Sequence, residues 1–364
     1  MKMKRTLFLS LISLFSWESA DSFLVLTPSL QIINNSISRP VTSLGAIAAL
    51  AKKAKQNELR QYVEAGVPDS VMKIYQEMQN RYKNIDLLAT DLPNKLQQEL
   101  TRRRGTLTII AEYNRKTRFT DSGIIKDLYD PEIVSPIFRE YLASAIAVTA
   151  DERMGACDYS TLEAFVKEQK RAHMEVPGPI MVINNDLILD ELQIARTVDV
   201  GADAVVLSAA VLEKDELEKL LKCAAAVEVE AIVAVTSAEQ AQQAIDMGAR
   251  MISVQGISDN EERAALLQSL KMPEGRIVTT ICNLGAAKGK GDLQEIEDAW
   301  FLRDKGYNSI IVGETLYKSG SLEIEHPGVI IRSMKSKSSL KFASPKASNG
   351  RGEGAREYLG DILM

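Results

Sequence analysis

The sequence predicts an α/β fold, a closed (β/α)8 barrel of the TIM type with an N-terminal helical extension and a disordered, basic C-terminal tail. Between residues 106 and 313, eight short apolar runs alternate with amphipathic segments. This alternation is typical of parallel βαβ units, and eight units in about 210 residues have the count and length of a TIM barrel. A doubly wound open sheet is the alternative, but it rarely contains eight such regular units.

The barrel strands are expected where the apolar runs lie. These runs are Leu107–Ala111, Ala145–Thr149, Ile180–Ile183, Ala204–Leu207, Ala231–Val235, Met251–Val254, Ile277–Ile281 and Ser309–Val312. Three of the helix-to-strand junctions begin with Gly201, Gly248 or Gly306. Because glycine adopts the left-handed conformation at little steric cost, each of the three is expected to end a helix before the next strand.

Residues 46–104 are predicted to form a helical extension that packs on the barrel, which is expected to span residues 105–320. One helix face is indicated by the spacing of Val71, Ile74, Tyr75 and Met78. A Gly-Val-Pro-Asp segment at residues 66–69 interrupts the extension. Asp69 or Ser70 is therefore expected to cap the helix that follows.

The two ends of the chain are predicted to lie outside the packed fold. Residues 1–20 combine a basic start, a short apolar run and small residues at a cleavage point, which is typical of a signal peptide. Residues 21–45 form a transit-like segment with Phe23 close to the cut. Together they resemble the bipartite leaders of algae whose plastids lie inside the secretory system. We therefore expect a plastid stromal protein, with secretion as the alternative. Residues 321–364 are rich in Ser, Lys and Gly and lack apolar periodicity, which predicts a flexible tail.

The composition excludes several classes of function. The net charge of −5 gives no reason to expect nucleic acid as a partner, and no stable membrane span is expected in the mature chain. Cys157, Cys223 and Cys282 are far apart, and His173 and His326 are the two histidines. This sparse set argues against a disulfide framework, a structural zinc site and Ser-His-Asp hydrolysis. No metal and no cofactor are expected.

The most informative stretch is residues 109–116, Ile-Ile-Ala-Glu-Tyr-Asn-Arg-Lys, because a buried strand there runs into a cluster of polar residues. This stretch, which ends in Lys116, resembles the first barrel strand of the indole-3-glycerol-phosphate synthases. The resemblance covers roughly residues 106–318. It extends to residues 201–207, 215–221, 248–250 and 312–316.

The resemblance implies a ring closure that releases carbon dioxide and water, in tryptophan biosynthesis. Such chemistry calls for a cation near the substrate carboxylate, a general acid and carboxylates that move protons. Glu112 and Lys116 match the family pattern and are the expected catalytic residues if the protein is active. The other family positions are substituted: Asn114 and Asn185 replace lysines, Ala234 and Asn283 replace glutamates, Gln255 replaces an asparagine, and Leu284 replaces a serine. A misalignment of the strand ends by a residue or two is the alternative to this interpretation.

A phosphate site is predicted after the last two strands. Barrels of this type often bind phosphate with backbone N–H groups of these loops, so Gly285, Lys288, Gly313 and Glu314 are the expected phosphate-binding residues. A flexible loop with solvated lysines is the alternative interpretation.

Three functions are compatible with these patterns. The first is a non-catalytic barrel that acts as a ligand-binding, regulatory or structural plastid protein. The second is a divergent but active synthase, and the third is a barrel enzyme for another sugar phosphate. A small phosphorylated ligand is the expected partner, and a protein that binds the barrel surface or the basic tail is a further candidate.

Overall fold

The computed structural model describes residues 41–89, 92–102, 105–116, 123–125, 130–285, 292–317 and 326–336. Residues 1–40 of the predicted leader, Lys288, and residues 321–325 and 337–364 of the predicted tail lie outside these residues. The prediction that the flexible tail begins at residue 321 is wrong, because His326–Lys335 form a helix that buries Ile330, Ile331 and Met334 in the core. The predicted transit-like segment also extends too far, since the first described helix begins at Val41. Among the residues described, none of the helices combines the length and the apolar character needed to span a bilayer.

Eight parallel strands form a closed barrel in which each strand pairs with its neighbours in sequence and β8 pairs with β1. The strands are β1 (Thr108–Tyr113), β2 (Ala145–Val148), β3 (Met181–Asn184), β4 (Ala204–Ser208), β5 (Glu230–Val235), β6 (Met251–Val254), β7 (Thr279–Asn283) and β8 (Ser309–Val312). The barrel prediction is therefore confirmed, and the open sheet is excluded.

Two strands, β7 and β1, have bounds that differ from the prediction by two residues for physical reasons, and other strand bounds differ by at most one residue. The expected strand at Ile277–Ile281 begins at Thr279, because Ile277 lies in the preceding loop with 66% of its surface exposed. The first strand continues past Ala111, because Glu112 and Tyr113 still pair with Ala147 and Val148 of β2. Glu112 thus belongs to the strand itself, which fixes its side chain to one face.

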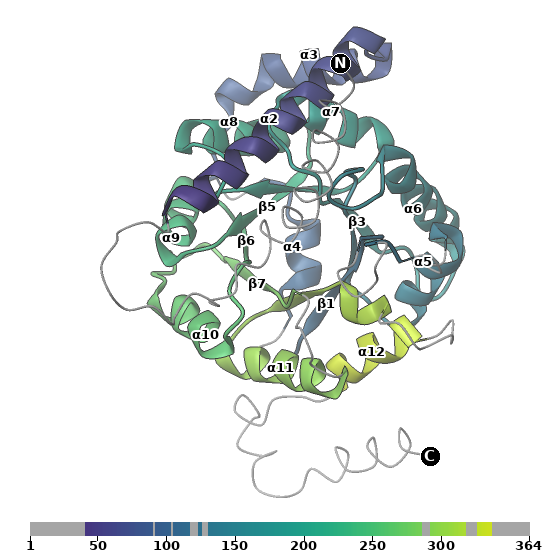
Figure 1. Ribbon diagram of the computed structural model, residues 1–364, viewed down its shortest axis with the longest axis vertical. Coiled ribbons are helices and arrows are strands. Elements are labelled where there is room, and N and C mark those ends of the chain that lie inside the picture. Colours follow the sequence, from purple (N-terminus) through teal and green to yellow (C-terminus); the bar gives the residue numbers. More distant parts are fainter. Residues whose placement is uncertain are drawn as a thin grey trace, which may run out of the picture.

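A ring of helices surrounds the strands, and Figure 1 looks down the barrel through this ring. The ring contains α5 (Pro131–Glu140), α6 (Tyr159–Arg171), α7 (Glu191–Val200), α8 (Lys214–Ala226), α9 (Ala238–Met247), α10 (Asn260–Ser269), α11 (Asp292–Lys305) and α12 (His326–Lys335), with short 3-10 turns η3 (Ala172–Met174) and η4 (Glu314–Tyr317). Gly201, Gly248 and Gly306 have φ values of 88°, 113° and 115°, as predicted for residues that end helices.

The segment before the barrel is helical and contacts both ends of it. It contains α2 (Val41–Ala65), α3 (Asp69–Arg81), η2 (Tyr82–Asn84) and α4 (Lys95–Leu100). The predicted cap at Asp69 or Ser70 is wrong: α3 begins at Asp69, and Pro68 occupies the cap position without a side-chain hydrogen bond. In Figure 1, α2 crosses one side of the rim and α4 lies within the ring.

α4 closes the end of the barrel at which the strands begin. Leu96 and Leu100 pack against interior residues of the strands, such as Ile110. The backbone N–H groups of Leu96 and Gln97 donate to the carboxylate of Glu230, the first residue of β5, at 2.6 and 3.0 Å. Because this end is filled, a ligand can reach the interior only from the end at which the strands finish.

Candidate active site at the carboxyl ends of the strands

Five of the eight expected catalytic positions belong to the inward-facing set of the strands. Ile110, Ile183, Ile232 and Ile281 pack together inside the barrel. Side chains alternate along a strand, so residues two positions further along face the same way. These residues are Glu112, Asn185, Ala234 and Asn283. Gln255, two positions after the inward-facing Ser253, completes the set on β6. One carboxylate and several neutral groups thus line this end of the barrel.

Glu112 is held by two neutral donors from neighbouring strand ends. Its Oε1 atom accepts a hydrogen bond from Thr149 Oγ1 at 3.1 Å and another from Asn185 Nδ2 at 3.0 Å. Asn185 Nδ2 also lies 3.3 Å from Thr149 Oγ1. The three side chains therefore form one connected network across β1, β2 and β3.

The second carboxylate oxygen of Glu112 faces β8. A Cβ atom built on Gly313 would lie 2.5 Å from Glu112 Oε2, so any side chain at this position would force the carboxylate or the backbone to shift. The Tyr317 hydroxyl donates to the Glu112 carbonyl at 2.9 Å. Burial raises the pKa of Glu112, the bonds from Thr149 and Asn185 lower it, and the nearby charge of Glu314 raises it; the net shift is upward.

Lys55 of α2 reaches the same end of the barrel, although the sequence analysis did not assign it to the site. Its Nζ atom forms ion pairs with Asp186 Oδ1 at 2.7 Å, with Asp151 and with Glu58 Oε2 at 2.9 Å. Lys55 is 3% exposed. Burial by itself would lower the pKa of its ammonium, but Asp186 and Asp151 outweigh this effect and raise it above its ordinary value. Lys55 is therefore a fully protonated, fully paired cation.

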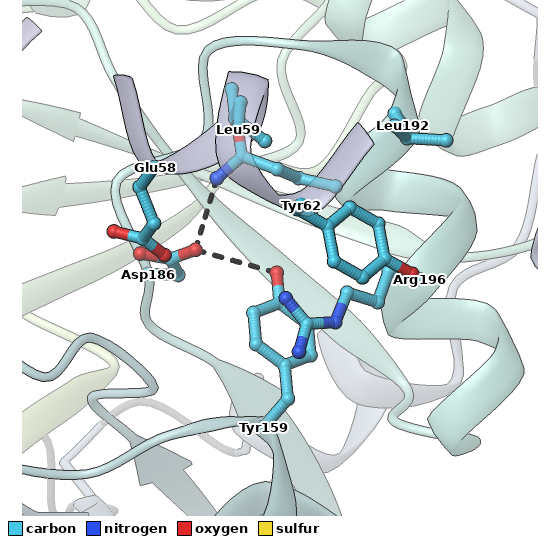
Figure 2. Close-up of a pocket in the computed structure, with 8 residues that line it drawn as sticks. Glu58, Leu59, Tyr62, Tyr159, Asp186, Leu192 and Arg196 are labelled. Carbon is cyan, nitrogen blue, oxygen red and sulfur yellow. Dashed lines mark hydrogen bonds between the residues drawn. The ribbon is translucent and has the colours of Figure 1, made fainter. Parts of the chain in front are cut away.

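Asp186 is the most strongly perturbed acid in this cluster. Complete burial raises its pKa to about 6, although Lys55 opposes the shift. Its second oxygen accepts hydrogen bonds from Gln193 Nε2 at 2.9 Å and from the Tyr159 hydroxyl at 3.3 Å. Figure 2 shows the contact of Tyr159 with Asp186 beside Arg196, whose guanidinium lies 3.7 Å from the Tyr159 ring centroid. The enclosed space among these side chains is about 10 Å³, which is room for one water molecule but not for a substrate.

The end of β7 is fixed by two sets of hydrogen bonds. Asn283 Oδ1 accepts from the backbone N–H of Gly285 at 2.8 Å. Arg263 donates to the carbonyl oxygens of Asn283 at 3.3 Å and Leu284 at 2.8 Å. The expected phosphate donor at Gly285 therefore already has a partner, and an anion would have to displace the Asn283 side chain to use it. The amide nitrogen of Asn283 is buried without a hydrogen-bond partner.

The remaining predicted residues lie outside the hydrogen bonds that join Glu112, Thr149 and Asn185. Asn114 accepts a hydrogen bond from the backbone N–H of Lys116 at 2.8 Å, so both belong to the loop after β1. The Leu284 side chain packs in the outer core rather than inside the barrel. Glu314 begins η4, close enough to Glu112 for its charge to act on that carboxylate. The expected cation Lys288 lies outside the described residues.

Comparison with known proteins identifies the family of this barrel. The family model described as indole-3-glycerol phosphate synthase matches residues 57–325. The chain belongs to the indole-3-glycerol-phosphate synthase family. It is 29% identical to the indole-3-glycerol phosphate synthase of Carboxydothermus hydrogenoformans over 63% of this chain and 81% of that protein. It is 28% identical to the one of Chlorobium phaeovibrioides over 66% of this chain and 87% of that protein.

The match to the synthase family begins at residue 57 within α2, so Lys55 lies just before it. The sequence does contain a pattern that points to Lys55. Ala51, Lys55, Leu59 and Tyr62 are spaced as one helix face, and Lys55 occupies the middle of that face. A lysine on the packed face of a helix needs buried acidic partners. Asp151 and Asp186, which follow β2 and β3, are those partners.

Proposed function

We propose that this barrel binds a small phosphorylated ligand at its open end without catalysing the ring closure of the indole-3-glycerol-phosphate synthases. The observation that carries the proposal is the environment of Glu112. Its carboxylate is bonded to the neutral groups Thr149 and Asn185, where the family resemblance calls for a lysine at position 185.

The protonation chemistry of the described residues supports this proposal. The carboxamide of Asn185 has no proton to donate as an acid at any useful pKa. Lys55 lies nearby, but its ammonium is paired with Asp151, Asp186 and Glu58. Its raised pKa makes it a poor proton donor. The loss of one general acid or base lowers a rate by roughly 10²–10⁴-fold, so even the substitution at position 185 is sufficient to leave little turnover.

Two measurements on the purified chain test the proposal. The first follows indole fluorescence during incubation with carboxyphenylamino-deoxyribulose phosphate, with Glu112→Gln as the matched control. We expect no difference between the two proteins. The second measures the melting temperature with and without sugar phosphates of three to five carbons, and we expect a rise. Turnover that Glu112→Gln abolishes would refute the non-catalytic function, and a melting temperature that no sugar phosphate raises would refute ligand binding.

The second candidate function is an active synthase, and one observation favours it. Burial raises the pKa of Glu112, which is the direction of shift that a carboxyl group needs to act as a general acid. In such an enzyme, Glu112 would take over the proton donation of the family lysine, and Lys116 would supply the positive charge. Turnover that persists in Lys55→Met but disappears in Glu112→Gln would favour this candidate.

The compartment of the protein is a separate proposal. We infer from the basic start, the short apolar run and the acid-poor segment before residue 46 that the chain enters a plastid through the secretory system. A fusion of residues 1–45 to a fluorescent protein, expressed in an alga with such plastids, tests this inference. Fluorescence in the stroma is the expected result, and fluorescence in the medium would support secretion instead.

A further inference from the structure

The two groups that hold Glu112 each lie close to an aspartate in the chain. Thr149 Oγ1 and Asn185 Nδ2 are the donors to Glu112 Oε1. Asp151 follows shortly after Thr149, and its backbone N–H donates to the Thr149 carbonyl at 2.8 Å. Asp186 directly follows Asn185. Because so little backbone lies between each donor and its aspartate, a shift of either aspartate moves a donor of Glu112.

A single cation from the N-terminal extension binds both aspartates. Lys55 Nζ pairs with Asp186 Oδ1 at 2.7 Å and with Asp151 Oδ2. Lys55, Asp151 and Asp186 are 3%, 4% and 4% exposed. Two carboxylates so deeply buried repel each other unless a cation lies between them. The ammonium therefore draws together the two loops that follow β2 and β3.

Each aspartate also has hydrogen bonds within its own loop. Asp151 Oδ1 accepts from the backbone N–H groups of Arg153 and Met154, both at 2.8 Å. Asp186 Oδ1 accepts from the backbone N–H of Leu187 at 2.7 Å. The two side chains thus fix the conformations of their loops. The position that the ammonium gives to a carboxylate is therefore passed on to the whole loop.

The other ion pairs of α2 do not reach these two loops. Lys52 pairs with Glu216 of α8 at 2.7 Å. Glu58, the third partner of Lys55, belongs to α2 itself. Among the described residues of α2, Lys55 is therefore the one whose ion pairs join the ends of β2 and β3.

We propose that Lys55 is a positioning residue that holds the ends of β2 and β3 together through Asp151 and Asp186. It thereby places the two donors that bond Glu112. When the ammonium is removed, the two aspartates repel each other, the loops separate, and the hydrogen bond from Asn185 to Glu112 is lost. This role goes beyond the proposed function and does not rest on it, because it concerns the chain without a ligand.

Hydrogen exchange of the Asn185 side-chain amide, followed by NMR on the full chain, tests this role. In Lys55→Ala the amide should exchange about tenfold faster than in the unmodified chain, as expected for the loss of one hydrogen bond. Ile245→Ala is the control for a general loss of stability. Ile245 is buried in α9, between β5 and β6 and away from β1–β3, so this variant should leave the exchange of Asn185 unchanged.

A chemical rescue of Lys55→Ala distinguishes the charge of the lysine from its packing. The substitution removes a chain of three carbons and an ammonium, which propylammonium matches in length and charge. Propylammonium added to Lys55→Ala should restore slow exchange of the Asn185 amide. The neutral analogue 1-propanol should not restore it. Equal effects of the two compounds would overturn the role of the charge.

A second pair of variants keeps the lysine and gives a result even if Lys55→Ala does not fold. Asp151→Asn retains Oδ1, the acceptor for the loop N–H groups, and replaces Oδ2, which faces the lysine. The Asn185 amide should then exchange faster. Glu58→Gln also removes one carboxylate from Lys55, but Glu58 does not follow a strand, so exchange should stay slow.

Unchanged exchange of the Asn185 amide in Asp151→Asn would overturn the proposal. An equal increase in Asp151→Asn and Glu58→Gln would also overturn it, because the effect would then come from the charge balance of the cluster alone. None of these measurements involves a phosphorylated ligand. Their outcome is therefore independent of whether the barrel binds sugar phosphates.

Discussion

Lys55 Nζ lies 2.7 Å from Asp186 Oδ1, so a lysine of the N-terminal helix is paired with a carboxylate at the end of the third barrel strand. Asp151, after the second strand, accepts the same ammonium. The extension is thus joined to the rim of the barrel by a buried ion cluster.

The first prediction concerns this cluster. Lys55→Met leaves two buried carboxylates without their cation, so the free energy of unfolding should fall by about 3–5 kcal/mol. Lys52→Met, one turn earlier, removes a partly exposed pair with Glu216 and should cost about 0–1 kcal/mol. Urea unfolding of the two variants measures both values. Equal losses would contradict the special role of Lys55.

A rescue variant can show whether Lys55→Met loses stability through its missing charge or through its missing packing contacts. In Lys55→Met combined with Asp151→Asn and Asp186→Asn, no buried charge of the cluster remains unpaired. This triple variant should therefore be more stable than Lys55→Met alone. A triple variant that is no more stable than the single one would show that the lysine stabilises the fold by its packing and not by its charge.

The second prediction is a pH dependence at Glu112. Its pKa is higher in the folded chain than in the unfolded chain, mainly because of burial. The ionised form therefore destabilises the fold above the folded pKa, and this effect disappears as the pH falls below the unfolded value of about 4.3. Glu112→Gln should melt at a higher temperature than the unmodified chain at pH 8, and the difference should shrink at pH 4.

Glu64→Gln is the control for this pH effect, because Glu64 is exposed on α2. It should change the melting temperature little at either pH. If Glu112→Gln melts below the unmodified chain at pH 8, the bonds from Thr149 and Asn185 to the carboxylate dominate over its burial.

The third prediction concerns the close approach of Gly313 to Glu112. An alanine at position 313 would place Cβ 2.5 Å from Glu112 Oε2, so Gly313→Ala should destabilise the fold by about 1–3 kcal/mol through overpacking. Gly178→Ala is the matched control, because its Cβ would meet its nearest neighbour at 3.7 Å. In a double-mutant cycle, Glu112→Ala should remove most of the cost of Gly313→Ala. Additive costs would contradict this contact.

The fourth prediction restores the family pattern. Asn185→Lys places an ammonium beside Glu112, and Asn114→Lys and Ala234→Glu restore a cation and a carboxylate at the other two strand ends. If the proposed function is right and these substitutions prevent ring closure, the triple variant should form indole product at a rate at least about 10²-fold above the unmodified chain. An unmodified chain that is already as active as the triple variant would contradict the account.

The barrel could be predicted from the sequence because its strands are continuous apolar runs and three of its helices end at glycines. The boundaries were harder to predict. Ile277 is apolar but lies exposed in a loop, and Glu112 is charged but lies within a strand. Hydrophobicity alone cannot tell an apolar loop residue from a strand residue, or a charged strand residue from a loop residue. The ends of a strand depend instead on its pairing with neighbouring strands.

The site was predictable only in part. The inward direction of Glu112 and Asn185 follows from the alternation of side chains along a strand. The ion pair of Asp186 with Lys55 could not be predicted in this way, because Lys55 lies far away in the sequence. Likewise, Gly285 has the residue type of a phosphate loop, yet its N–H is bonded to Asn283. Such contacts between side chains and backbone depend on tertiary geometry, which residue types do not reveal.

A single-turnover experiment, with the protein in excess over carboxyphenylamino-deoxyribulose phosphate and the indole product quantified after prolonged incubation, tests the proposed function. If the barrel binds the ligand without ring closure, the unmodified chain should form no product above that of Glu112→Gln, whereas the triple variant with Asn114→Lys, Asn185→Lys and Ala234→Glu should form it. Stoichiometric product from the unmodified chain would refute the proposed function and establish an active synthase.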